Sequence, residues 1–166
     1  MAALRDLLES HGHTKVSTYI ASGNVILSSD KSAAGIKGEL EDALPSTFKL
    51  DSELIAVLVL TQAQLRAVVR DRPKGFGDQP GTYHSDAVFL MGIDTAAAMQ
   101  VFEPRPGVDE VWPGKGVIYS QRLTAQRTKS RLNRIVGTPA YKSMTIRSWS
   151  STMALLERME AREDGA

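Results

Sequence analysis

The residues best suited to chemistry in this sequence are basic and lie in one stretch, residues 111–156. This stretch contains no Asp or Glu, although the whole chain has a formal net charge of only +1. Its basic residues are Lys115, Arg122, Arg127, Lys129, Arg131, Arg134, Lys142 and Arg147. Because ammonium and guanidinium groups neutralise phosphate, a phosphate-bearing partner is the first chemistry to consider.

Four of these basic residues make up the main candidate ligand-binding cluster. Two of them are three positions apart, so on a helix they would share one face. Two interpretations remain open: an anion site for nucleic acid or a phosphorylated ligand, or the solvated basic face of a small domain. The aromatic residues nearby are scattered and predict no base-stacking platform. The four residues are Lys129, Arg131, Arg134 and Arg147.

Arg147 differs from the rest of the cluster because it alternates with Thr145 and Trp149 along a predicted strand. Residues spaced by two share a strand face, and we expect Trp149 to be a core anchor there. A buried guanidinium needs a carboxylate or an anion. Asp109, Glu110, a residue of the first half or a ligand would have to supply it.

Ser22 and Asn24 are the polar candidates in the first half of the chain. They flank Gly23 between two short apolar runs, which is typical of a turn. The alternative interpretation is that both side chains contribute polar groups to a cleft between the two halves, beside Arg147. In that case the protein would be a small-molecule enzyme.

No catalytic motif accompanies these residues, so we predict no catalytic residue, no metal site and no cofactor. Residues 75–77 lack the Gly-Lys-Ser/Thr ending of a phosphate loop. His11 and His13 have no third metal ligand nearby, and His84 is isolated in the sequence. The sequence leaves open whether a reaction is catalysed.

Composition places the chain among ordinary globular proteins. It has 166 residues, of which 42% are hydrophobic and 23% are charged, and it has no cysteine. No apolar run approaches the roughly 20 residues of a membrane span, and the start resembles no signal peptide. We therefore expect a cytoplasmic protein that has no membrane partner; the sequence leaves its oligomeric state open.

Periodicity predicts the secondary structure of the first half. A helix over residues 2–11 precedes a hairpin with strands near 16–20 and 25–27. The next helix has caps near Ser32 and should stop at Pro45. The apolar run 54–60 favours a buried strand, and Thr61 opens a further helix. Residues 72–84 are rich in Gly and Pro, which indicates a linker or a long loop.

The second half repeats this order after an additional strand at 87–91. Asp94 caps a helix, strands near 110–112 and 117–119 form a hairpin, and a helix follows through Leu132, Ile135 and Val136. A strand at 144–147 and a final helix complete it. We therefore predict an α+β fold of tandem ferredoxin-like (βαββαβ) subdomains, residues 1–72 and 85–166. The first subdomain lacks its opening strand, and we expect the natural chain to start upstream of Met1.

Several segments also resemble a known family, the bacterial domain of unknown function 1697. The matching segments are residues 18–25, 117–119, 129–132 and 145–149. The resemblance covers nearly the whole chain and implies paired ferredoxin-like subdomains without an established activity. Members usually open with a strand and an Arg-Gly-Ile-Asn-type turn, which this chain lacks. Members also tend to have Arg-Asn-Trp near the end, where this chain has Ser148 in place of Asn.

The leading hypothesis from the sequence is a non-catalytic module that binds an anionic partner, nucleic acid or a phosphorylated ligand, through its basic second half. A small-molecule enzyme and a self-association module are the alternatives.

Overall fold

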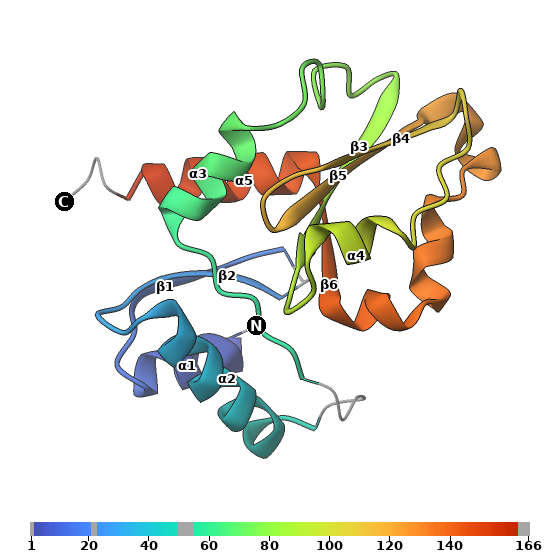
Figure 1. Ribbon diagram of the computed structural model, residues 1–166. Coiled ribbons are helices and arrows are strands. Elements are labelled where there is room, and N and C mark those ends of the chain that lie inside the picture. Colours follow the sequence, from blue (N-terminus) through green and yellow to red (C-terminus); the bar gives the residue numbers. More distant parts are fainter. Residues whose placement is uncertain (1, 21–22, 50–54, 163–166) are drawn as a thin grey trace. The chain divides into compact units, whose positions relative to one another are not determined.

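A computed structural model describes residues 2–20, 23–49 and 55–162, and it divides into two compact units (Figure 1). Unit 1 comprises Met1–Thr61 and Glu157–Ala166, and unit 2 comprises Gln62–Leu156. Each unit has its own antiparallel sheet, so the predicted α+β class is confirmed. Among the described residues, no helix is both long enough and apolar enough to cross a membrane.

The described residues of unit 1 before residue 62 form two helices and one hairpin, and the end of helix α5 (Trp149–Glu160) also belongs to this unit. The elements before residue 62, in chain order, are α1 (Ala2–Ser10), β1 (Thr14–Tyr19), β2 (Asn24–Ser28) and α2 (Ala33–Thr47). Strands β1 and β2 pair in antiparallel register, with Tyr19 opposite Asn24. Leu8, Val16, Ile26 and Ile36 are buried and supply one apolar side chain from each element. The predicted first helix and hairpin are confirmed.

Two predictions for unit 1 are wrong. Helix α2 continues through Pro45 to Thr47, because the missing N–H of a proline in the last turn costs only one bond. The Phe48 N–H still donates to the Leu44 carbonyl at 2.9 Å. Residues 55–60 form no strand, and Leu54 lies outside the described residues. The Val57 N–H donates to Glu41 Oε1 at 2.9 Å. Its acceptor is therefore a side chain of α2 and not the backbone of a neighbouring strand.

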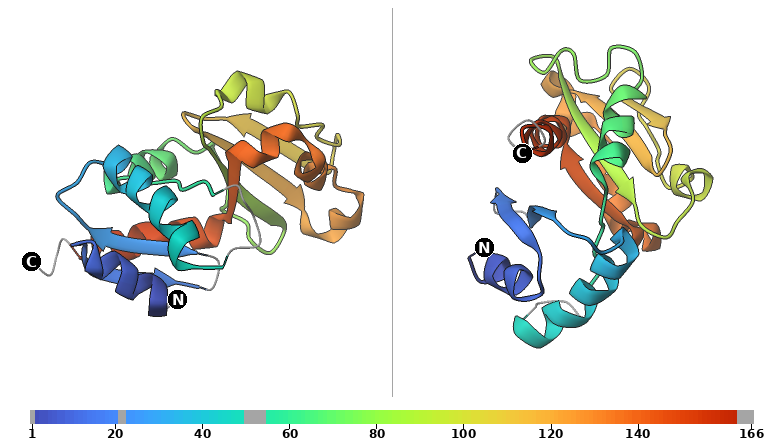
Figure 2. Two further views of the ribbon diagram at one scale, coloured as in Figure 1. Left: turned by 90° about the horizontal axis from the view of Figure 1, so that it is seen from below. Right: turned by 90° about the vertical axis from the view of Figure 1, so that its left-hand side faces the viewer.

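Unit 2 is built on a four-stranded antiparallel sheet with the order β4-β5-β3-β6, which Figures 1 and 2 show as one twisted surface. The first strand of the unit, β3, is therefore an interior strand. The strands are β3 (Tyr83–Leu90), β4 (Asp109–Pro113), β5 (Val117–Leu123) and β6 (Met144–Ser148). The helices are α3 (Gln62–Arg70), α4 (Thr95–Met99) and the first part of α5 (Trp149–Glu160).

The predicted α-helix through Leu132, Ile135 and Val136 is absent. Three 3-10 helices replace it: η1 (Thr124–Lys129), η2 (Leu132–Gly137) and η3 (Pro139–Ser143). Thr138 has an extended backbone because Pro139 disfavours a helical conformation in the residue before it. Leu132 and Ile135 are buried as expected, but Val136 is 54% exposed.

The two faces of the unit 2 sheet have separate apolar layers. One face carries Val88 and Ile118 in a buried cluster with Phe102, which follows α4, and with Leu132 of η2. On the other face, the Tyr119 hydroxyl donates a 2.7 Å hydrogen bond to the Val68 carbonyl of α3. Burial raises the pKa of Tyr119 to about 12, as expected for a phenol removed from water.

Replacement of Tyr119 by Phe should lower the free energy of unfolding by about 1–2 kcal/mol, because the Val68 carbonyl loses its side-chain donor in a buried place. Urea denaturation followed by tryptophan fluorescence measures this change. The phenyl ring keeps the packing, so the difference reports the hydroxyl alone. An unchanged midpoint would mean that water replaces the lost donor.

Residues 72–84 are the predicted linker or loop. Residues 72–82 form a loop packed within unit 2, but residues 83 and 84 begin β3. Phe76 at the centre of the loop is 1% exposed. The Phe76 ring lies 5.1 Å from the Trp149 ring and 5.2 Å from the Tyr119 ring, both edge to face. Trp149 is 8% exposed, which confirms it as a core anchor. Beside it, Gly77 has φ +79, and a Cβ there would lie 2.2 Å from Trp149 Cδ1.

Candidate functional site

The predicted site residues that the structure describes belong to both units: Asn24 to unit 1, and Lys129, Arg131, Arg134 and Arg147 to unit 2. Ser22 lies outside the described residues. Asn24 is the first residue of β2, is 8% exposed and donates through Nδ2 to the Tyr19 carbonyl at 3.3 Å. This bond closes the hairpin, which agrees with the interpretation of the Asn24 side chain as part of a turn.

Lys129, Arg131 and Arg134 lie together in what we call the basic segment, residues 124–143, which spans η1 to η3. Lys129 and Arg134 are exposed, and Arg131 is half-buried. Arg134 Nη1 lies 3.2 Å from Glu103 Oε2 in an ion pair whose two side chains are both largely exposed. The Arg131 backbone N–H donates to Asp109 Oδ2 at 2.8 Å, which fixes the segment against β4.

Arg147 lies on the opposite face of the sheet from Asp109, one of the several partners that the sequence left open for it. The β3–β6 register puts Arg147 beside Ala87, and Asp109 pairs with Arg122 on the other face. Arg147 Nη1 donates to Thr145 Oγ1 at 2.9 Å and to the Ile146 carbonyl at 2.8 Å. Burial lowers the pKa of Arg147. The structure therefore places Arg147 apart from the basic segment.

A pocket of about 230 Å³ lies on the sheet face that carries Val88. Side chains of β3, β5, β6 and η2 line it. Its polar lining residues are His84, Asp86, Ser120, Arg122 and Asn133. Its apolar lining residues are Val88, Phe102, Leu132, Ile135 and Ile146. One wall of the pocket is thus part of the apolar core, and the other is the polar end of the sheet.

Strand register explains why these polar residues meet. His84 and Asp86 are two apart on β3 and share a face. His84 pairs with Arg122 and Asp86 pairs with Ser120 across the β3–β5 ladder. The immediate sequence neighbours of His84 do not include Arg122, so this group cannot be recognised from the sequence around His84 alone. The alternation of His84, Asp86 and Val88 was the available signal, but the partner strand was needed to complete it.

Asp86 is the centre of a polar triad with His84 and Arg122. His84 Nε2 lies 3.1 Å from Asp86 Oδ1, and Arg122 Nη1 lies 3.7 Å from Asp86 Oδ2. Asp86 is 8% exposed, and its desolvation raises the pKa of the carboxyl, opposed by the charges of His84 and Arg122. The triad can accept or donate a proton and can contact an anion through Arg122.

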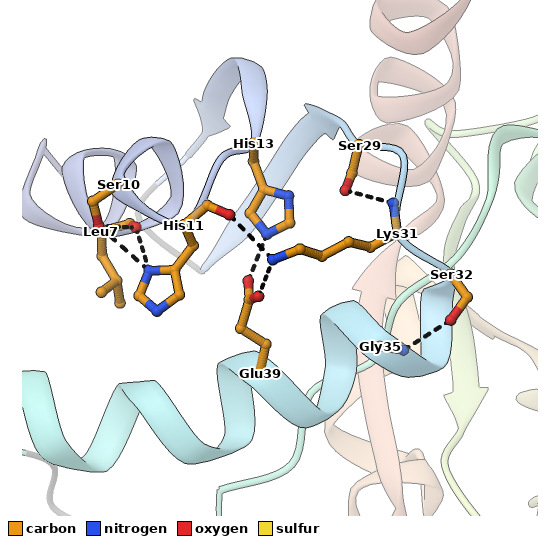
Figure 3. Close-up of polar contacts among 9 residues, drawn as sticks. All are labelled: Leu7, Ser10, His11, His13, Ser29, Lys31, Ser32, Gly35 and Glu39. Carbon is orange, nitrogen blue, oxygen red and sulfur yellow. Dashed lines mark hydrogen bonds and ion pairs between the residues drawn. The ribbon is translucent and has the colours of Figure 1, made fainter.

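Unit 1 holds a second polar cluster, shown in Figure 3, around Glu39 of α2. His13 Nε2 lies 2.8 Å from Glu39 Oε1, and the His13 side chain has no exposed surface. Lys31 Nζ donates to Glu39 Oε2 and, at 3.1 Å, to the His11 carbonyl. The hydrogen bond from Lys31 lowers the pKa of Glu39 most, and His13 lowers it further. The cluster fastens the start of β1 to α2.

Neither cluster resembles a metal centre. Within the described ranges, no group of three or more His, Cys, Asp or Glu side chains is placed to hold a metal ion.

The fold and these sites define a mixed α/β protein with two antiparallel sheets. The chain belongs to the family described as protein of unknown function DUF1697, whose model matches residues 1–119. A similar solved structure is a conserved bacterial protein from Streptococcus pneumoniae, at 21% identity and a TM-score of 0.76, over 96% of this chain and 88% of that one. At 21% identity, this structural similarity shows a shared fold and nothing about function. No curated protein gave a match.

Proposed function

We propose that this protein is a non-catalytic binding module that contacts the phosphate backbone of a nucleic acid through its basic segment. One observation carries the proposal. Residues 124–143 contain five Lys and Arg residues and no Asp or Glu. Among the described residues, Glu103 is the one carboxylate that forms an ion pair with a basic side chain of the segment, that of Arg134. The segment therefore presents positive charge that the protein itself leaves largely uncompensated.

The exposure of these cations supports a polyanion over a single small anion. Arg127, Lys129, Arg134 and Lys142 are all exposed, and they lie along three consecutive short 3-10 helices. Exposed cations in water bind one isolated anion weakly. A nucleic acid gains from the same cations by releasing its condensed counterions, whichever bases it carries.

A pair of charge-neutralising variants tests the proposal. Arg127→Gln and Lys129→Gln should each weaken binding to a fluorescent duplex and lower the slope of log affinity against log salt by about 0.9. Fluorescence anisotropy at several salt concentrations measures both quantities, with single-stranded RNA and heparin as further probes. Lys115→Gln is the matched control, because Lys115 is exposed in the β4–β5 turn of the same unit, outside the basic segment. Negligible binding at low salt, or an equal loss in the control, would overturn the proposal.

We also infer that the chain contains two subdomains of the ferredoxin-like plan, residues 1–72 and 85–166, whose strands lie in unit 1 and unit 2 respectively. The interior position of β3 and the order β4-β5-β3-β6 support this for unit 2, with the 3-10 helices in the place of its second helix. In unit 1 the order α1, β1, β2, α2 supports it. Cross-strand nuclear Overhauser effects between β3 and both of its neighbours test the arrangement.

We place the protein in the cytoplasm, where fluorescence microscopy of a tagged chain would find it.

A further inference from the structure

The polar end of the unit 2 pocket leaves one charged group short of hydrogen-bond acceptors. The Arg122 side chain is 20% exposed, and Asp86 is the one carboxylate among the described residues that forms an ion pair with it. The carboxylate of Asp109 lies further off but still interacts with its charge. The closest atoms of Arg122 and Asp86 are 3.7 Å apart, which is an ion pair but too long for a hydrogen bond. A guanidinium has five N–H donors, and those of Arg122 are still open to solvent in the pocket, because no Arg122 nitrogen is among the buried atoms that lack a partner. Arg122 therefore lies ready for an acceptor that the described residues do not provide.

We propose that this pocket binds a small monocarboxylate with a short apolar body, its carboxylate on Arg122 and its body against Val88, Phe102 and Ile146. All of these residues line the same pocket. A carboxylate offers two coplanar oxygens, which match the fork of a guanidinium. His84 also lines the pocket and pairs with Arg122 across the β3–β5 ladder, so its ring lies on the same side of the pocket as the guanidinium.

The charges around Arg122 favour one negative charge over two. Asp86 already lies 3.7 Å from Arg122, and Asp109 pairs with Arg122 across the β4–β5 ladder. The carboxylate of Asp109 is held by backbone N–H groups of Arg105 and Arg131, at 3.0 and 2.8 Å, which lower its pKa against the effect of burial. Because Asp86 and Asp109 already oppose the charge of Arg122, each further negative charge is less favourable than the one before, and the dianion of a phosphate monoester fits worse than a monoanion. Like charges held close together repel, so a monoanion is the better fit.

The apolar wall and the volume of the pocket determine the polarity and the size of the rest of the ligand. Phe102, Leu132 and Ile135 continue from the wall into the buried cluster of unit 2, so this side of the pocket cannot pair a polar group. The volume of about 230 Å³ is below the roughly 300–1,000 Å³ of drug-sized sites. An aliphatic chain of a few carbons or a single aromatic ring therefore suits the site better than a nucleotide or a sugar.

Titration of the whole chain with butyrate, valerate and benzoate tests the assignment. Amide chemical shifts in ¹⁵N-labelled protein should change along β3, β5 and η2 at millimolar ligand. The matched butanol and butylamine should leave these shifts unchanged, and butyl phosphate should bind more weakly. Tighter binding of butylamine would mean that Asp86 is the recognition group, and tighter binding of butyl phosphate would mean a dianion site. Either result, or no response to any carboxylate, would overturn the proposal.

Two variants locate the site. Arg122→Gln should weaken carboxylate binding roughly 10-fold to 100-fold, as the loss of a charged hydrogen-bond partner predicts. Arg147→Gln is the control, because that half-buried arginine lies on the opposite face of the sheet, and it should leave the affinity unchanged. Ile146→Phe fills the apolar wall, keeps Arg122 and should also abolish binding, so the test stands even if Arg122→Gln unfolds. Equal binding by wild type and Ile146→Phe would place the ligand elsewhere.

Discussion

Replacement of Phe76 by Ala is expected to destabilise unit 2 by about 3–5 kcal/mol, the usual cost of removing a buried aromatic ring. Phe76 is 1% exposed, and its ring meets three other rings edge to face. The centroid distances are 6.0 Å to Trp112, 5.2 Å to Tyr119 and 5.1 Å to Trp149. Its loss leaves a cavity and removes every one of these aromatic contacts.

Urea denaturation followed by near-ultraviolet circular dichroism measures the effect, since the signal of Trp112 and Trp149 depends on this cluster. Val136→Ala is the control, because Val136 is 54% exposed and its truncation should change stability by no more than about 0.5 kcal/mol. If Phe76→Ala were as mild as Val136→Ala, residues 72–82 would be a passive linker, as their Gly and Pro content alone suggests.

The Phe76 cluster shows why composition misleads about loops. Pro73, Gly75 and Gly77 correctly predict that residues 72–82 avoid helix and strand. They carry no information about what Phe76 touches, because its partners are about 36 to 73 positions away in the chain. Such partners follow from strand order and register, which a single sequence does not contain.

Local signals predicted the elements that depend on local physics. The hairpin around Gly23 and the Asp94 cap, whose Oδ1 accepts from the Ala97 N–H at 2.9 Å, follow from short-range rules. The apolar run 54–60 predicts a strand, but its described residues, 55–60, form none. Hydrophobicity alone does not supply a neighbouring strand for the N–H groups. In the structure the Val57 N–H is instead satisfied by Glu41, a partner that no local pattern would indicate.

The site was less predictable than the fold. The basic segment was visible because charge can be counted along the chain. The pocket triad was not, because His84, Asp86 and Arg122 become neighbours only through the β3–β5 register. The partner of His13 in the structure, Glu39, lies 26 positions further along the chain, where no local pattern links the two residues. Chemistry assembled across strands and helices therefore needs the fold first.

Replacement of Glu39 by Ala should destabilise unit 1 by about 1–3 kcal/mol at neutral pH, the cost of leaving a buried polar group without its partner. The His13 ring has no exposed surface, and its Nε2 bonds to Glu39 at 2.8 Å. Within the described ranges its Nδ1 is buried without a hydrogen-bond partner. Loss of Glu39 would leave both ring nitrogens unsatisfied and would release Lys31 from α2.

The pH dependence of the stability distinguishes the effect of the Glu39 charge from the effect of packing alone. The pKa of Glu39 is lowered from 4.5 in the folded state, mainly by the hydrogen bond from Lys31, so its stabilising effect is present above the unfolded pKa. It is lost as pH falls through the lower folded pKa. The stability difference between wild type and Glu39→Ala, measured by urea denaturation from pH 7 to about pH 3, should therefore shrink in the acid range.

Glu103→Ala is the matched control for this experiment, since Glu103 also pairs with one basic side chain, Arg134, but both partners are largely exposed. Exposed ion pairs contribute little, so this variant should stay within about 1 kcal/mol of wild type. Glu39→Gln sharpens the result further, because the amide can still bond to His13 but no longer carries the charge that Lys31 stabilises. A difference between wild type and Glu39→Ala that stays constant down to pH 3 would show that Glu39 acts only through packing of its methylene groups against the start of β1.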